Sequence, residues 1–211
     1  MASAPPAPLR PPFAPTGKFR PFLGLALRAN LGVGQLRVSV NDRSISGSAF
    51  PVGLALGIAA ARNLIVFGEA YQAHVFRPRG DNGTLSALDL YGVGPGLKYH
   101  FKPMNVFLSG SLLISWVKYT GIEMTHAGLT GRFSAGKEWW IAPSWTLGVA
   151  GEYLLGHMEG KSSGYPVATR DGFTATGYSL LVSSSFVFPP GPSDALSGSH
   201  ASAMDNAHNE F

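Results

Sequence analysis

The stretch Val52-Gly-Leu-Ala-Leu-Gly-Ile-Ala59 decides the fold of this chain. Large apolar residues take every second position, and Gly or Ala stands between them. Because side chains alternate between two faces of a β-strand, this period of two predicts a strand with one bulky apolar face and one small face. Gly53 and Gly57 also have the spacing of packed membrane helices, but Gly is frequent throughout the sequence, so we prefer the strand.

The overall composition favours the same class of protein. Only 13% of the 211 residues are charged, whereas an ordinary soluble domain has about 25%. With 45% hydrophobic residues and 27 Gly, the chain is neither a disordered polyampholyte nor a collagen-like repeat. The absence of Cys excludes disulfides and thiolate sites, and the scattered basic residues behind the net charge of +4 predict no nucleic-acid partner.

Alternating segments recur along most of the chain and are joined by connections that are alternately long and short. The predicted strands are 18–34, 49–60, 64–76, 88–101, 106–117, 129–141, 145–156 and 178–188. The long connections are 35–48, 77–87, 118–128 and 157–177, and the short ones are 61–63, 102–105 and 142–144. An even number of strands with this alternation predicts an all-β fold, an eight-stranded antiparallel up-and-down transmembrane β-barrel.

In this organisation, residues 18–188 resemble the small outer-membrane barrels of the OmpA/OmpX-like group, although no diagnostic motif is present. The resemblance implies the outer membrane of a Gram-negative bacterium, with both termini and the short turns on the periplasmic side. It also implies contact with outer-membrane lipid (lipopolysaccharide, or detergent after purification) and with the barrel-assembly machinery, which reads a terminal strand such as 178–188 ending on Phe188. We expect a monomer.

The two faces of the predicted strands differ in residue size and charge. An eight-stranded lumen barely admits side chains, so the small and charged parity is expected to face inward and the bulky apolar parity to face lipid. The predicted outward residues are Leu23, Leu25, Leu27, Leu31, Val33, Tyr91, Val93, Leu97, Tyr99, Val106, Leu108, Leu112, Ile114, Trp116, Leu147, Val149, Tyr153 and Leu155.

Six charged residues fall on the inward parity near mid-depth. They are Arg28, Glu69, Lys98, Arg132, Glu138 and Glu152. Glu69 is assigned inward because a charge exposed to lipid would be costly. Three positive and three negative charges cancel, and buried charges persist when they are paired, so we predict an ionic network that closes the lumen. A proton or ion pathway through the same charges is the alternative.

Aromatic residues gather at both ends of the predicted strands, as the two membrane interfaces require. The interfacial residues expected near the short turns are Phe19, Phe22, Tyr99, Phe101, Phe107, Trp139, Trp140, Trp145, Phe186 and Phe188. Those expected near the long connections are Phe50, Phe76, Tyr91, Trp116, Tyr119, Tyr153 and Tyr178.

The sequence contains few candidate catalytic residues. His126 and His157 lie beside Thr125 and Glu159 at the bases of long connections, where a lipid A-modifying barrel would hold its site, but their spacing matches no motif. We therefore assign no catalytic residue, cofactor or metal. The alternatives to a structural barrel are a narrow pore or hydrophobic-solute conduit, a lipid A-modifying enzyme, and a soluble lipocalin-like barrel, the last disfavoured by the apolar exterior.

The remaining features lie in the connections and tails. Arg79-Gly80-Asp81 is similar to the tripeptide of integrin ligands, but residues 81–83 also form an ordinary turn sequence, so adhesion is a weak option. Residues 1–17 are Pro-rich and residues 189–211 are polar, so both are predicted to be disordered tails flanking the barrel.

Overall fold

The computed structural model describes residues 24–40, 43–61, 63–80, 83–84, 87–101, 104–119, 127–161 and 170–188. The predicted tails 1–17 and 189–211 lie outside these residues. So do Phe19, Phe22, Leu23, Asp81, Thr125 and His126, each of which carried a sequence-based expectation.

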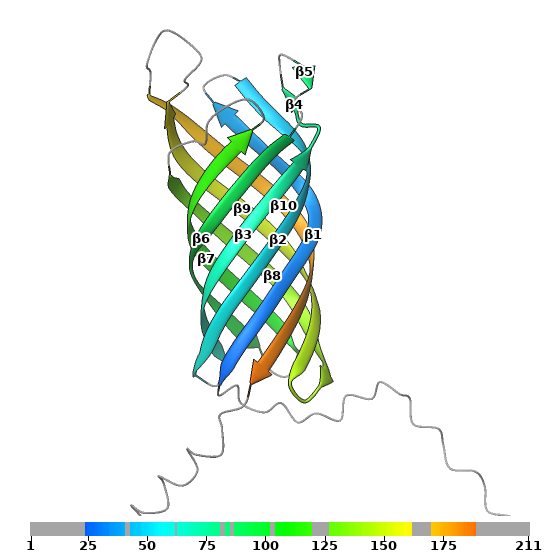
Figure 1. Cartoon of the computed structure of the whole chain (residues 1–211). Coiled ribbons are helices and arrows are strands. Elements are labelled where there is room, and N and C mark those ends of the chain that lie inside the picture. Colours follow the sequence, from blue (N-terminus) through cyan, green and yellow to red (C-terminus); the bar gives the residue numbers. More distant parts are fainter. Residues whose placement is uncertain are drawn as a thin grey trace, which may run out of the picture.

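Eight long strands build the molecule (Figure 1). They are β1 (Leu25–Val40), β2 (Arg43–Ala61), β3 (Leu64–Phe76), β6 (Ala87–Phe101), β7 (Val106–Tyr119), β8 (Gly128–Ala142), β9 (Trp145–Lys161) and β10 (Arg170–Phe188). Two short strands, β4 (Arg79–Gly80) and β5 (Gly83–Thr84), form a hairpin that pairs with β2. Among the described residues, no helix has the length and hydropathy of a membrane span.

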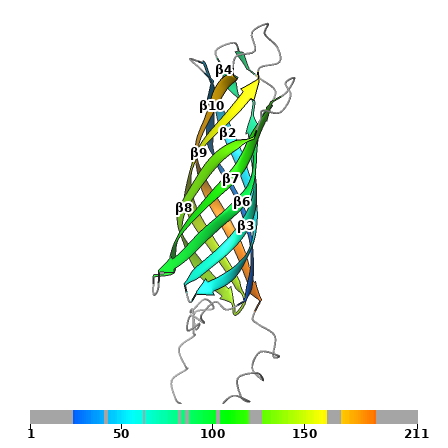
Figure 2. The same cartoon turned by 90° about the vertical axis from the view of Figure 1, so that its left-hand side faces the viewer.

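The sheet closes on itself. Each long strand is antiparallel to its neighbours, and β1 pairs with both β2 and β10, from Leu25↔Ile58 and from Leu25↔Phe188 onward. Closure leaves no unpaired edge among the eight long strands, which tilt around a common axis in both views (Figures 1 and 2). The predicted eight-stranded antiparallel barrel is confirmed.

The two ends of the barrel differ. We call the end where β1 begins and β10 ends the turn end, which is the lower end in Figure 1, and the opposite end the loop end. The chain passes from β2 to β3, from β6 to β7 and from β8 to β9 at the turn end. At Asn105, between β6 and β7, the backbone has a φ of 56°, a left-handed conformation that Asn tolerates in tight turns.

Two of the predicted long connections are wrong. Residues 35–48 were expected to be a loop, yet β1 continues to Val40 and pairs it with Arg43 at the start of β2. Residues 157–177 likewise contain the end of β9 and the start of β10. Residues 18–23 of the first predicted strand lie outside the described residues. The Gly, Ser and Thr residues that suggested loops belong to strands whose outward face has become polar.

The polarity of the barrel reverses along its axis. From the turn end, the outward face is apolar for nine residues on β1 (Leu25–Val33) and, except for Ser184, for eleven residues on β10 (Tyr178–Phe188). Nearer the loop end, exposed outward positions become polar: Gln35, Arg37, Ser48, Gln72, Lys118, His157 and Thr174. The inside changes in the opposite sense, because the lumen at the loop end is filled by a cluster that includes Leu36, Val38, Val75, Leu88, Leu90, Val117, Met158, Phe173 and Ala175.

Two prolines interrupt the sheet. Pro95 pairs with Gly68 of β3, but the β6–β7 register passes from Val93↔Ile114 to Gly96↔Ser111 without it. Pro51 similarly pairs with Ala73 of β3 and has no partner on β1. A proline has no backbone N–H to donate, so each of them interrupts the hydrogen-bonded ladder between two neighbouring strands. We call such an interruption a seam.

Candidate functional site in the lumen

All six predicted lumen charges are buried inside the barrel, with exposed fractions between 3% and 8%. They come from β1, β3, β6, β8 and β9, which lie around the whole circumference. Because alternate residues of each strand face inward, strands far apart in sequence bring these side chains into one lumen. There they form two separate groups.

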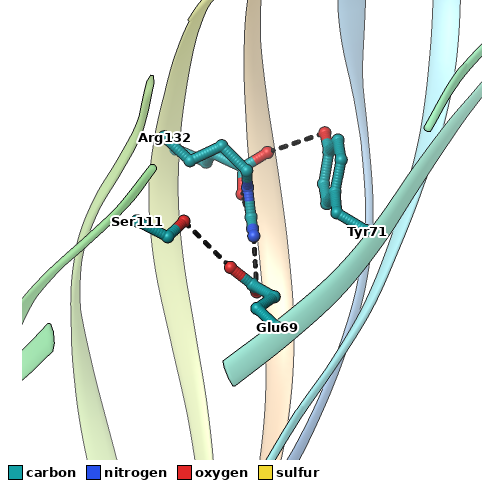
Figure 3. A network of polar contacts seen from close by, with 5 residues as sticks. Glu69, Tyr71, Ser111 and Arg132 are labelled. Atoms are coloured by element: carbon teal, nitrogen blue, oxygen red, sulfur yellow. Dashed lines mark hydrogen bonds and ion pairs between the residues drawn. The ribbon is translucent and has the colours of Figure 1, made fainter. Parts of the chain in front are cut away.

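The first group lies near the middle of the lumen, and we call it the central group: Glu69, Tyr71, Ser111, Arg132 and Glu152 (Figure 3). Arg132 reaches across the lumen and holds a carboxylate on each side. Its Nη1 lies 2.5 Å from Oε1 of Glu69, and its Nε donates a 2.9 Å hydrogen bond to Oε2 of Glu152, which Nη2 also contacts.

Neutral side chains complete the central group. The Ser111 hydroxyl donates to Oε2 of Glu69 over 2.9 Å, and the Tyr71 hydroxyl donates to Oε1 of Glu152 over 3.2 Å. The Arg132 guanidinium also lies 4.1 Å from the centroid of the Tyr71 ring. Each ion therefore has both a charge partner and hydrogen bonds, the condition under which buried ion pairs are tolerated. The central group holds one cation and two anions.

The second group lies toward the turn end, and we call it the turn-end group: Arg28, Lys98, His100, Phe107 and Glu138. Lys98 Nζ lies 2.5 Å from Oε1 of Glu138, and His100 Nε2 lies 3.9 Å from the other carboxylate oxygen. The Phe107 ring is flanked by two cations, with Lys98 Nζ at 4.4 Å and the Arg28 guanidinium carbon at 5.0 Å from its centroid.

The charges balance in number but not in space. Arg132 engages two of the three carboxylates and Lys98 engages the third. Among the described residues, no carboxylate oxygen lies within the 4.0 Å ion-pair distance of Arg28, and its buried Nε has no hydrogen-bond partner. The sequence predicted which charges enter the lumen, but not this division.

Two small cavities adjoin these groups. One, of about 20 Å³, lies beside the turn-end group and is lined by Arg28, Lys98, His100, Glu138 and Ser185 among others. The other, of about 10 Å³, lies between the two groups, beside Arg28, Glu69, Ser111 and Arg132. A cavity needs about 10–15 Å³ of this kind to hold one water molecule, so both are of water size.

The predicted interfacial aromatics divide between the two faces. Tyr99, Phe101, Trp139, Tyr153 and Phe188 are exposed on the outside. Trp145 stacks on Phe186 with centroids 5.8 Å apart and donates a 2.8 Å hydrogen bond to Ser184, and Trp116 stacks on Tyr91 at 6.2 Å.

Two aromatic assignments are wrong. Phe107 is fully buried in the lumen, and Trp140 packs against the inward residues Ala26 and Ile65. The signal for both was present: Phe107 shares its parity with Ser109, and Trp140 shares its parity with Glu138. Tyr71 shares its parity with Glu69 and therefore also faces inward. The alternation in the sequence could thus have identified Tyr71 as a partner of the lumen charges.

The residues considered for catalysis do not form a site in the described part of the chain. His157 and Glu159 are exposed on β9. On the outside of β3 and β6, His74 Nδ1 lies 2.7 Å from Asp89 Oδ1, and Gln72 donates to the same oxygen over 3.3 Å. Within the described residues, no three His, Asp or Glu side chains gather as a metal site would require.

The fold of this chain is similar to those of solved structures. The chain superposes on Neisserial surface protein A with a TM-score of 0.57 at 13% identity, covering 78% of this chain and 97% of that one. The fold is that of a small outer-membrane barrel. Other matches are OprG of Pseudomonas aeruginosa (TM-score 0.47, 11% identity, 80% and 97% covered) and Ail of Yersinia pestis (TM-score 0.44, 15% identity, 78% and 99% covered).

No protein-family model matches the chain. No curated protein matches it either. The likeness to known proteins is therefore one of architecture.

Proposed function

We propose that this protein is a small structural barrel of the Gram-negative outer membrane, closed by its lumen charges, that presents its loop end outside the cell. The observation that carries the proposal is the apolar outer band. It covers nine residues on β1 and on β2 (Phe50–Ile58), eleven on β9 (Trp145–Leu155) and, with Ser184 as an exception, eleven on β10. A tilted strand needs about 9–11 residues to cross a bilayer, so the band has the height of the hydrocarbon layer.

Membrane physics explains why the polar residues are inside. Hydrocarbon cannot hydrogen-bond a backbone group or solvate a charge, so a spanning sheet must close and carry its ions in the lumen. In a soluble barrel the exposed band with Leu54, Leu56, Leu97 and Leu112 would be an aggregation site. The polar outer surface near the loop end, with its apolar interior, has the polarity of a soluble protein and suits a segment that stands above the membrane.

The lumen supports a barrel that does not conduct. The central group bridges β3, β8 and β9, and the two water-sized cavities that adjoin the charged groups leave little room for ions to pass. The apolar cluster at the loop end adds a layer through which a hydrated ion would pass at high cost. We place the turn end and both termini in the periplasm and propose a monomer that contacts lipopolysaccharide and, during assembly, the barrel-assembly machinery.

The test is folding with and without an amphiphile. The urea-unfolded chain is diluted into buffer alone, into detergent micelles and into phospholipid vesicles, and its gel mobility is compared before and after heating. We expect heat-modifiable mobility and β-rich circular dichroism only with micelles or vesicles. A monomer that folds and stays in solution without an amphiphile would exclude the proposal.

A second candidate, a conduit for hydrophobic solutes, is favoured by the seam at Pro95, because the preceding residue, Gly94, pairs with Glu69, which lines the smaller cavity. Entry of a fluorescent apolar solute into protein-containing vesicles measures this activity, and Pro95→Val, which restores a donor to the seam, should slow it. Rates equal to those of protein-free vesicles for both proteins would remove the conduit.

Catalysis is not part of the proposal. Lipid A from cells with and without the protein, compared by mass spectrometry, should be identical. An added or missing acyl chain in the presence of the protein would establish a lipid A-modifying enzyme instead.

A further inference from the structure

Arg28 lacks a countercharge in direct contact. It is 92% buried, and its guanidinium touches no carboxylate among the described residues. An arginine stays protonated in any protein environment, so it cannot escape the cost of burial by becoming neutral. Its guanidinium carbon lies 5.0 Å from the centroid of the Phe107 ring, and this cation–π contact offsets only part of the cost of burying an ion.

The three lumen carboxylates make their direct contacts with residues other than Arg28. Glu138 is held by Lys98 at 2.5 Å. The two carboxylates of the central group accept from Arg132, Tyr71 and Ser111, so they act on Arg28 only at longer range. The turn-end group thus holds two cations, Arg28 and Lys98, against one anion.

A cavity with unused donors adjoins Arg28. The 20 Å³ cavity is lined by Arg28 and by Ser185 of β10, which is 93% buried. Neither Arg28 Nε nor Ser185 Oγ has a hydrogen-bond partner in the described part of the structure. The guanidinium can only donate and a serine hydroxyl can donate, so the cavity offers two donors. Its charged lining consists of two cations, Arg28 and Lys98, and one anion, Glu138, so positive charge is in local excess.

We infer that this cavity binds a small monovalent anion of halide size between the Arg28 guanidinium and the Ser185 hydroxyl. The volume admits about one small particle and is too small for a carboxylate with a carbon chain. A water molecule would satisfy the donors but not the charge, whereas a halide satisfies both. The smaller cavity, of about 10 Å³, has room for about one water molecule and is too small for a halide. This inference rests on the lumen geometry and does not depend on where the protein resides.

The first test uses bromide as the probe. Crystals of the full chain grown from detergent are soaked in sodium bromide, and an anomalous difference map is calculated at the bromine edge. We expect a peak within hydrogen-bond distance of Arg28 and Ser185. A soaked crystal with no anomalous peak in this cavity means that water alone occupies it, and the inference is then wrong.

The second test is made in solution. The unfolding midpoint of the barrel in micelles is followed as bromide replaces gluconate, a bulky anion, at constant ionic strength. The wild-type midpoint should rise and saturate, and Arg28→Met should show no bromide dependence. An unchanged wild-type midpoint, or a dependence that persists in Arg28→Met, overturns the inference.

A matched pair of serine variants separates binding from stability. Ser183 and Ser185 both lie on the inward face of β10 with buried, unpartnered hydroxyls, but only Ser185 lines the cavity. Ser185→Ala should raise the half-saturating bromide concentration about tenfold or more, as expected for the loss of a hydrogen bond to a charged group. Ser183→Ala should leave it unchanged. Equal effects of the two substitutions contradict the assigned position.

Discussion

At the scale of single residues, Arg132 is the most connected side chain of the lumen. It holds Glu69 and Glu152 at once and lies on the face of Tyr71. A buried carboxylate that loses its cation costs more than a lost hydrogen bond, because the remaining charge stays desolvated. The consequences of removing Arg132 and of removing a neutral partner should therefore differ in size.

Arg132→Met leaves two buried carboxylates without their cation. We expect the free energy of unfolding to fall by about 3–5 kcal/mol, measured by urea titration in phospholipid vesicles. The triple variant with Glu69→Gln and Glu152→Gln should recover most of this loss, because no unpaired charge remains. A single variant as stable as the wild type would show that Arg132 does not hold the central group together.

Tyr71→Phe removes only the hydroxyl that donates to Glu152 and keeps the ring against Arg132. The expected loss is about 1.5–3 kcal/mol, the usual contribution of a hydrogen bond to a charged group, measured by the same titration. Tyr71→Leu, which also removes the cation–π contact, should cost more. A Phe variant less stable than the Leu variant would contradict the geometry.

At the scale of elements, each strand passes through two environments. On β2, the outward residues Leu54 and Leu56 belong to the apolar band, whereas Ser48 lies above it on the same face. The inside of the same strand carries only small residues at the level of the band: Gly53, Ala55 and Gly57. The end of the apolar band therefore falls within a single strand, and substitutions along the outward face of β2 can locate it.

Leu54→Arg places a charge in the middle of the apolar band. In vesicles we expect a loss of about 2–4 kcal/mol of folding free energy, whereas Ser48→Arg, its control on the same face, should cost at most about 1 kcal/mol. Chemical unfolding in vesicles measures both. Equal losses would mean that the band does not lie in hydrocarbon.

The loop-end cluster should behave like a soluble protein core. Leu90 on β6 is almost fully buried within it, so Leu90→Ala should cost about 2–5 kcal/mol through the cavity it leaves. Leu97→Ala on the outer face of the same strand removes the same atoms from a half-exposed position and should cost less. Urea unfolding in vesicles compares the two, and a larger loss at Leu97 would be evidence against a packed loop end.

At the scale of the whole molecule, the proposed closure of the lumen predicts a barrel that does not conduct ions. The charged groups cross the lumen near its middle and toward the turn end, and the apolar cluster fills the loop end. Wild-type protein in planar bilayers should therefore show no stable single-channel conductance. A narrow pore instead predicts steps that grow when Arg132 or Glu152 becomes Ala, and silence for all three proteins removes the pore.

The sequence by itself determined the number of long strands in the barrel and the alternation of their two faces. Period-two alternation is a local property, and the exclusion of ions from an apolar outer surface selects their face without knowledge of distant contacts. The sequence-based prediction that residues 35–48 and 157–177 are loops was wrong. The strands continue there beyond the apolar band, where the outward face is rich in Ser, Thr and Gly and therefore resembles a loop sequence.

Only the tertiary structure decided how the lumen charges are shared. Arg132 meets Glu69 across the barrel, and Lys98 meets Glu138, because strand register and tilt place them at matching heights. Register sums over every strand pair around a closed sheet, so no local pattern specifies it. For this reason six lumen charges that sum to zero still leave Arg28 beside a small cavity, with no carboxylate within ion-pair distance.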